Sequence, residues 1–346
     1  MEFAPAHLWE VAFMPKCVSI EKRFAECVIN VLKKHGLLDV KHKITKQDNE
    51  VLIPIREVDE EALKAIFSKC NGQASFTIKE CSPPKRKLTK VEDLPSFDIV
   101  GEVVIIRENA LISRNINEVV EKIRLAHPKI RAIWVKRETT SAFRVPTLEL
   151  LWGEELRDVI TKEYGIKLKA RLGHVYFNPR LAEEHYRVSK LVKDGEVVVD
   201  MFCGIGGFSI HIAARSLSLV IANDLNPVAY QLLLENIELN RGKIKGTIIP
   251  LNMDSVELSS VLRQESVDRI IADHPTESLS FVHEYNRLLK PHGVLNLYVL
   301  AKGEHEARAK VTAALSGWVV MGCREVLEHS PGTGIYRCDL IKPKNV

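Results

Sequence analysis

From residue 197 onward the chain alternates short apolar strands with helical segments, and this alternation limits the possible folds more than any other feature. Repeated strand–helix units predict an α/β fold, in which a mostly parallel, Rossmann-like sheet carries helices on both faces. The expected strands are 197–200, 219–222, 246–250, 269–272 and 293–300, followed by two near 319–328 and 335–341; the expected helices are 208–215, 227–240, 280–289 and 304–315.

The residues before this region form two smaller modules. Consecutive prolines at Pro83 and Pro84 fix φ and remove backbone donors, so we interpret the surrounding stretch as a linker. Short strands and amphipathic helices on either side of it predict two small α+β domains. The boundaries we expect are a small α+β domain at 1–81, a linker at 82–94, a second α+β domain at 95–175 and the larger α/β domain at 176–346.

The expected strands of the first domain are 18–20 and 51–55, and its expected helices are 21–34 and one capped by Asp59. In the second domain we expect strand character over 97–106, a helix over 116–126 and a strand over 130–135.

Composition narrows the class of protein. With 46% hydrophobic and 27% charged residues, extensive disorder is excluded. No run of 18 apolar residues occurs, so we expect no membrane span, and the first residues do not resemble a signal peptide. The seven cysteines form no CxxC pair, which indicates reduced cytoplasmic thiols instead of disulfides or a zinc site.

Basic residues are concentrated between residues 129 and 171. This stretch holds ten basic and six acidic side chains, an excess that equals the net charge of +4 of the whole chain. Either a solvated, charged face or a surface that contacts phosphates would produce the pattern.

The clearest chemical signal is the turn Asp200–Phe208 (DMFCGIGGF), which follows an apolar strand and opens a helix. Its Gly204-Ile205-Gly206 lets backbone approach a ligand, but it lacks the third glycine of the dinucleotide fingerprint. Asp224 and Asp254 follow the next two strands, where ligands bind in open α/β sheets. Each acid alone could instead cap the helix that follows it.

An acid, a short glycine turn and two further acids in this spacing resemble the class I S-adenosylmethionine-dependent methyltransferases. A neutral glycine turn suits a sulfonium amino acid better than a pyrophosphate. The two last strands, with no convincing helix between them, suit the antiparallel hairpin of that fold.

A closer resemblance is to the archaeal and eukaryotic tRNA (guanine-37, N1) methyltransferases and their relatives in wybutosine synthesis. It covers about residues 95–345, and residues 1–80 resemble the small N-terminal domain that contacts the outer corner of tRNA in some members. The segments that carry it are 143–145 (FRV), 176–185 (YFNPRLAEEH), 200–208, 222–227 (ANDLNP) and 235–240 (ENIELN).

This resemblance implies an enzyme that moves a methyl group from S-adenosylmethionine to N1 of guanosine 37, binding the anticodon loop of tRNA as a cytoplasmic monomer. Two alternatives remain. One is a wybutosine-pathway paralogue that transfers an aminocarboxypropyl group or methylates another base nitrogen; the other is a tRNA-binding protein without catalysis.

The resemblance also implies residue roles. Arg144 would hold guanine O6 through its planar fork, and Glu184 would take the N1 proton. Arg144 could instead pair with a nearby glutamate, and Glu184 with Arg180 one helical turn away. The implied cofactor site comprises Tyr176, Asp200, Phe202, Gly204, Gly206, Asp224, Leu225, Asp254 and Asp273, and the implied RNA contacts comprise Arg144, Arg180, His185 and Pro275.

Two positions depart from the family pattern. Asp273-His274-Pro275 stands where the family has Asn-Leu-Pro, so a carboxylate replaces an amide donor near the target base. His185 stands where the family usually has Arg. We expect Asp273 to be catalytically important, together with Glu184 and Arg144. No metal site is expected, because His283 and His292 are isolated in the sequence.

Overall fold

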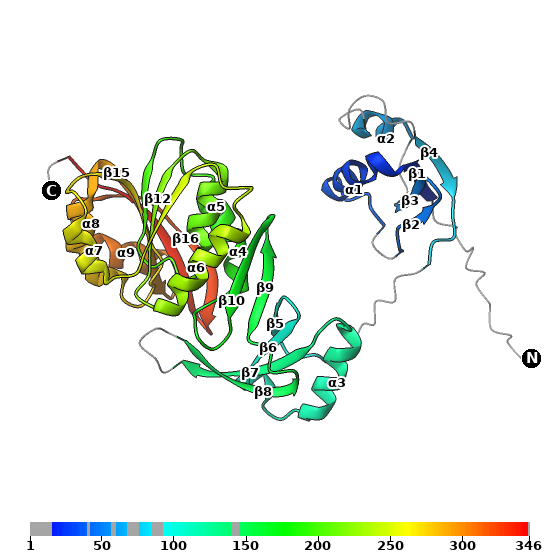
Figure 1. Cartoon of the computed structure of the whole chain (residues 1–346), viewed down its shortest axis with the longest axis horizontal. Helices are drawn as coiled ribbons and strands as arrows, with labels where there is room; N and C mark the ends of the chain where they lie inside the picture. The colour runs from blue at the N-terminus through cyan, green and yellow to red at the C-terminus, as the bar shows by residue number, and fades with distance from the viewer. Residues whose placement is uncertain are drawn as a thin grey trace, which may run out of the picture. The chain divides into compact units, whose positions relative to one another are not determined.

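The computed structural model describes residues 16–39, 42–56, 60–67, 76–84, 93–139 and 145–344. The chain divides into two compact units, Met1–Lys90 and Val91–Val346, each shown in Figure 1 and described here by itself. Among the helices in these described ranges, none has the length and apolar character needed to cross a membrane.

The first unit is a small α+β module built on a four-stranded sheet in the order β2-β3-β1-β4. Both predicted strands and the first predicted helix are confirmed, and Val28, Leu32 and Leu63 are fully buried between helices and sheet. The predicted cap Asp59 lies outside the described residues. The elements are β1 (Lys16–Glu21), η1 (Lys22–Phe24), α1 (Ala25–Lys34), β2 (Thr45–Gln47), β3 (Glu50–Ile55), α2 (Glu60–Phe67) and β4 (Phe76–Glu80).

Disulfides correct one sequence-based prediction. Cys17 is bonded to Cys81, and Cys323 is bonded to Cys338, which is its direct cross-strand partner in the antiparallel pair β16·β17. The prediction of reduced thiols is therefore wrong for these residues. Sheet pairing brings the sulfurs together, and spacing along the chain does not reveal it. Cys203 is a free, buried thiol in the described part of the chain.

The second unit begins with a four-stranded sheet in the order β5-β6-β7-β8. The predicted strand region 97–106 is a hairpin that turns at Gly101, whose φ of +58° favours glycine. Helix α3 has the predicted limits, and Asn115 caps it by accepting the amide hydrogens of Asn117 and Glu118. The elements are β5 (Phe97–Val100), β6 (Val103–Arg107), η2 (Glu108–Leu111), α3 (Ile116–Ala126), β7 (Ala132–Thr139) and β8 (Pro146–Gly153).

A second hairpin, β9 (Asp158–Glu163) with β10 (Ile166–Arg171), connects this sheet to the large one. Strands β8 to β10 were not predicted, because charged side chains interrupt their apolar residues. Many basic residues of this region have acidic partners: Arg131 contacts Glu154, and Arg171 donates to Asp158. These exposed pairs support the interpretation of a solvated, charged face.

The large sheet has seven strands in the order β13-β12-β11-β14-β15-β17-β16. Five are parallel, and β17 runs antiparallel to both β15 and β16, as the predicted hairpin requires. The strands are β11 (Val197–Asp200), β12 (Leu219–Asn223), β13 (Thr247–Leu251), β14 (Val267–Ala272), β15 (Leu289–Ala301), β16 (Val319–Ser330) and β17 (Thr333–Ile341). The helices are η3 (Pro179–Leu181), α4 (Ala182–Ser189), α5 (Gly207–Arg215), α6 (Pro227–Leu239), α7 (Ser255–Val261), η4 (Ser278–Phe281), α8 (Val282–Leu288) and α9 (Glu304–Ala314).

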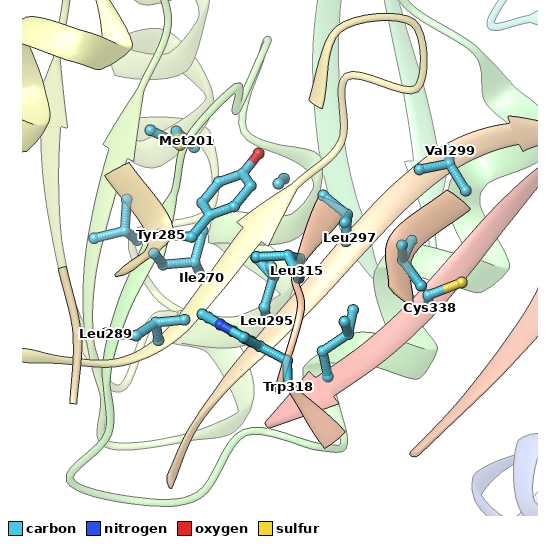
Figure 2. Packing of buried hydrophobic residues seen from close by; sticks show 14 of the residues in the cluster. Met201, Ile270, Tyr285, Leu289, Leu295, Leu297, Val299, Leu315, Trp318 and Cys338 are labelled. Carbon is cyan, nitrogen blue, oxygen red and sulfur yellow. The ribbon is translucent and has the colours of Figure 1, made fainter. Parts of the chain in front are cut away.

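Helices cover both faces of this sheet (Figure 1), as the alternating pattern predicted. Val198 packs in the cluster that contains α4 and α5, whereas its neighbour Val199 packs in the cluster that contains α8 and α9. This opposition follows from the alternation of side chains along a strand. Figure 2 shows the second cluster, where the rings of Tyr285 and Trp318 fill the space beside Ile270.

Candidate functional site

A cavity of about 220 Å³ opens at the carboxyl ends of the parallel strands, where ligands bind in open α/β sheets. Asp224 follows β12, Asp254 follows β13 and Asp273 follows β14, so strand polarity alone brings the three acids together. The described residues that line the cavity are Tyr176, Phe202, Gly204, Asp224, Leu225, Asn226, Ala229, Asp254, Ser255, Asp273, His274, Glu277 and Phe281.

The glycine turn forms one wall of this cavity. Gly204 lines it with a φ of +55°, and an added Cβ there would meet nothing within 4 Å. Gly206 has a φ of +95°, and an added Cβ would lie 2.5 Å from Leu233 Cδ1. Glycine at 206 is therefore required by conformation and by packing, although Gly206 is not among the described residues that line the cavity.

Asp224 holds the turn and the next helix in register. Its Oδ2 accepts the amide hydrogen of Gly204 and its Oδ1 that of Asn226, each at 2.8 Å. Burial raises the pKa of this carboxyl group, and the two backbone hydrogen bonds oppose the rise. The neighbouring Leu225 lines the cavity with 54% of its surface exposed, which offers an apolar wall for a flat ring.

Asp254 and Asp200 differ in accessibility. Asp254 lines the cavity and also caps α7 by accepting the amide hydrogen of Val256 at 2.7 Å, so the helix-cap alternative holds for this acid. Asp200 is fully buried, accepts a hydrogen bond from Ser209 at 2.6 Å, and is not among the described lining residues. Burial raises the pKa of Asp200 to about 7.

Two aromatic residues shape the cavity. Phe202 makes edge contacts with Phe281 and His274, with ring centroids 5.1 and 5.2 Å apart. Tyr176 lines this cavity and also a second hollow of about 740 Å³, so it forms a wall shared by both. Among the residues that line the second hollow are Arg107, Lys136 and Arg137.

Glu184 lies in a buried polar network and is not among the described residues that line the cavity. Its side chain is 3% exposed, and its Oε1 accepts hydrogen bonds from Arg337 at 2.6 Å and from the Tyr298 hydroxyl at 3.1 Å. The alternative of a helical pair between Arg180 and Glu184 is wrong, because Arg180 donates to Asp98 at 2.7 Å.

The Tyr298 hydroxyl donates to Glu184 and is also close enough to Asp273 to be affected by its charge. Burial raises the pKa of this hydroxyl well above the usual range, and the charges of those two acids raise it further, so the hydroxyl remains a donor. Asp273 lines the cavity, and Pro275, two residues later, is buried.

Two predicted RNA contacts have other outcomes. His185 is buried and its Nδ1 lies 2.8 Å from Glu163 Oε2, which leaves little of its surface for RNA. Arg144, with Phe143, lies outside the described residues. Arg337 could not be recognised from the sequence, because a single arginine in a strand 153 residues from Glu184 gives no spacing signal.

Comparison with protein families assigns all three parts of the chain. Residues 159–315 match the TRM5/TYW2 methyltransferase domain, residues 17–63 the tRNA methyltransferase 5 N-terminal domain, and residues 84–156 the TYW2 N-terminal domain.

Individual relatives agree with these domains. The tRNA (guanine(37)-N(1))-methyltransferase Trm5b of Methanocaldococcus jannaschii is 34% identical over 84% of this chain and 88% of its own. The tRNA(Phe) (4-demethylwyosine(37)-C(7)) aminocarboxypropyltransferase of the same organism is 32% identical over 68% of this chain and 93% of its own.

Solved structures resemble the whole chain. The structure described as the complex of aTrm5 and tRNALeu covers 95% of this chain and 100% of its own, with a TM-score of 0.62 at 30% identity. The class I methyltransferase fold with small N-terminal domains is thereby confirmed. Domain matches, relatives and structures converge, and the chain belongs to the TRM5/TYW2 methyltransferase family.

Proposed function

We propose that this protein transfers a methyl group from S-adenosylmethionine to N1 of guanosine 37 in tRNA. Within the structure, the observation that carries the proposal is the shared wall at Tyr176. It separates an acid-lined cavity of nucleoside size from a larger hollow lined by Arg107 and Lys136. Arg137 also lines this hollow but is paired with Glu108 and Glu149. A cofactor and a polyanionic substrate can then approach each other from the two sides.

The cavity residues fit S-adenosylmethionine. Asp224 presents a carboxylate fixed by two backbone hydrogen bonds, which suits the ribose hydroxyls, and Leu225 and Phe202 offer apolar surface for adenine. Asp254 lies where it can accept from the adenine amino group. When bound, the cofactor supplies an electrophilic methyl group on its sulfonium.

Guanine N1 carries a hydrogen that must leave, so the reaction needs a proton acceptor. We assign this role to Glu184. Arg337 and Tyr298 occupy its Oε1, whereas its Oε2 has no hydrogen-bond partner in the described part of the chain and lies 3.7 Å from Arg187 Nη1. The positive charge of Arg337 compensates the buried carboxylate, and hydrogen bonds to such a base often tighten only when substrate binds.

Asp273 and Arg144 would orient the target base. A carboxylate at 273 attracts the N1–H or the 2-amino group of guanine and repels O6. Arg144 would donate to O6. Pro275 restricts the backbone that carries Asp273, and its carbonyl accepts the amide hydrogen of Leu300 at 3.3 Å.

The assembled substrate complex is a monomer bound to tRNA in the cytoplasm. The match of residues 17–63 to the tRNA methyltransferase 5 N-terminal domain supports a role for residues 1–81 at the outer corner of tRNA. The relative solved with tRNALeu supports tRNA as the partner.

Nucleoside mass spectrometry tests the proposal. The full chain is incubated with S-adenosylmethionine and an unmodified tRNA transcript, and with a control transcript whose guanosine 37 is replaced by adenosine. We expect N1-methylguanosine from the first transcript only.

A second candidate is transfer of an aminocarboxypropyl group, or methylation of another base nitrogen. Asp273 in place of the family's Asn favours it, as does the similarity to the aminocarboxypropyltransferase. A heavier adduct on a wyosine-containing tRNA would establish this candidate. Binding without product on either tRNA would leave the non-catalytic alternative.

A further inference from the structure

Three metal-binding side chains meet in the interior of the second unit, away from the cavity. They are Glu163 at the end of β9, His185 in α4 and His211 in α5, with side chains 3%, 8% and 2% exposed. Their ligating atoms all lie within 4.8 Å of one another.

Ordinary hydrogen bonding does not satisfy this cluster. His185 Nδ1 lies 2.8 Å from Glu163 Oε2, which accounts for one pair of atoms. His211 Nε2 is 3.6 Å from the same oxygen, too far for a hydrogen bond. Among the described residues, neither His211 Nε2 nor Glu163 Oε1 has a hydrogen-bond partner, although both are buried. Buried polar atoms are usually hydrogen-bonded, so these two atoms are available to a bound ligand.

The position of His185 is built into the backbone. An added Cβ at Gly207 would lie 2.5 Å from Cε1 and 2.6 Å from Nε2 of the His185 ring, so this glycine makes room for the imidazole. Phe208 packs on the ring edge with centroids 4.6 Å apart. The ring therefore has a fixed place facing Glu163.

We propose that Glu163, His185 and His211 bind a divalent transition-metal ion of the zinc class, with water as the fourth ligand. Two imidazoles and one carboxylate form a donor set that suits zinc. Zinc–ligand distances near 2.0–2.2 Å place tetrahedral ligand atoms about 3.3–3.4 Å apart. The two separations to Glu163 Oε2, 2.8 and 3.6 Å, lie on either side of this value. All three ligand atoms lie within 4.8 Å of one another, so binding would draw the two imidazoles toward a common ion.

The ion would fasten three elements that are distant in sequence. It would join the β9–β10 hairpin to α4 and to α5, and Glu184 is the residue that precedes His185. The role is structural, and the proposal does not depend on the identity of the methylated base. The sequence does not reveal this site, because the three ligands are 22 and 26 residues apart, which matches no compact zinc spacing.

Metal content of the untagged full chain gives the first test. The protein is loaded with Zn²⁺, desalted and measured by inductively coupled plasma mass spectrometry. We expect about one zinc per chain and a thermal midpoint that rises on loading. Failure of the wild-type chain to retain zinc would overturn the proposal and leave a metal-free ion pair of Glu163 and His185.

Variants and spectroscopy locate the ion. His211→Gln should weaken zinc binding at least about tenfold, whereas His283→Gln, at an exposed position, should bind as wild type does. Co²⁺ in the wild-type site should give the visible bands of a tetrahedral ion with nitrogen and oxygen ligands. Equal zinc binding by His211→Gln, or a near-ultraviolet thiolate band with Co²⁺, would place the metal elsewhere and reject the site.

Discussion

At the scale of single residues, Asp224 has a structural role, to which we propose that a cofactor-binding role is added. Its two oxygens already accept the amide hydrogens of Gly204 and Asn226, and each keeps a lone pair for a ligand. Asp224→Ala should therefore lower affinity for S-adenosylmethionine by about ten- to a hundredfold, the equivalent of about 1.5–3 kcal/mol. Isothermal titration calorimetry measures this loss.

Asp194→Ala is the matched control for Asp224, because Asp194 also accepts a backbone hydrogen bond, from Leu217 at 2.8 Å, outside the cavity. The control should bind the cofactor with unchanged affinity. Equal binding by Asp224→Ala and wild type would remove Asp224 from the cofactor site.

Substitutions at Asp273 and Glu184 should have opposite effects on methylation, which identifies the proton acceptor. If Asp273 only accepts a hydrogen bond from the base, Asp273→Asn should retain or raise N1-guanine methylation, since it removes a repulsive charge near O6 and restores a donor. Glu184→Gln should then lower turnover by roughly 10²–10⁴-fold, the scale of a lost general base. Single-turnover kinetics with tRNA compares the two variants.

The reverse pattern would overturn this assignment. A large loss in Asp273→Asn with a mild loss in Glu184→Gln would make Asp273 the acceptor, and its place in the cavity wall would then be the decisive feature. The guanine-N1 assignment would have to be revised with it.

Asp200 makes stability depend on pH in an unusual direction. Burial raises its pKa from 3.8 to about 7, so between these values the native state holds a proton that the unfolded state has released. Its contribution to the free energy of unfolding therefore falls as pH rises from about 4 to 7. Asp200→Asn should remove this slope, with about 1.4 kcal/mol for each unit of pKa shift.

Urea unfolding of wild type and Asp200→Asn at pH 5 and pH 7.5 measures the difference, with the wild type relatively less stable at the higher pH. Because Asn keeps an oxygen for the Ser209 hydroxyl, packing is preserved. A difference between the two proteins that is the same at both pH values would contradict the raised pKa.

At the scale of elements, the ion pair of Arg337 with Glu184 connects β17 to α4. Both side chains are at least 95% buried, and each has a second ionic partner: Glu184 Oε2 lies 3.7 Å from Arg187 Nη1, and Arg337 Nε lies 2.8 Å from Asp339 Oδ1. Because Arg187 still compensates part of the Glu184 charge, Arg337→Met should lower the free energy of unfolding by about 1–3 kcal/mol, below the cost of a fully unpaired buried charge, and adding Glu184→Gln should recover part of the loss. Chemical denaturation tests this, and a double variant no more stable than Arg337→Met would show that the pair is not the cause.

Elements with strong periodicity were predictable, and those held by tertiary contacts were not. Helix α3 has the limits that its apolar spacing predicts, and the β11–α5 unit follows its glycine turn. Strands β8 to β10 carry charged residues that pair across the surface, such as Arg171 with Asp158, so their sequence shows no apolar run. The buried pair of Glu184 and Arg337 depends on β17 reaching α4, which only the folded sheet defines.

At the scale of the whole molecule, the sequence predicts the class of fold and the edge of the sheet where the site lies. Strand polarity brings Asp224, Asp254 and Asp273 together as expected. The pattern does not distinguish the acids that line the cavity from Asp200, which is fully buried. The depth of such a side chain depends on the helix that packs over the end of its strand, and the sequence pattern does not give this packing.

The chain divides into the compact units Met1–Lys90 and Val91–Val346, so each unit should keep its own function when the other is removed. A chain that begins at Val91 should fold and bind S-adenosylmethionine as the full chain does, because the glycine turn and every acid of the cavity belong to the second unit. Keeping Asp93 and Leu94 matters, since Asp93 pairs with Arg114 and Leu94 packs against the core beneath α3. If the first unit contacts tRNA phosphates as we propose, this shortened chain should bind tRNA at least about tenfold more weakly, because such contacts supply much of the affinity for nucleic acids. Calorimetry measures cofactor binding, and filter binding measures tRNA binding, so the two effects are separated. If the shortened chain matches the full chain in tRNA affinity and turnover, the first unit has no productive contact with the substrate.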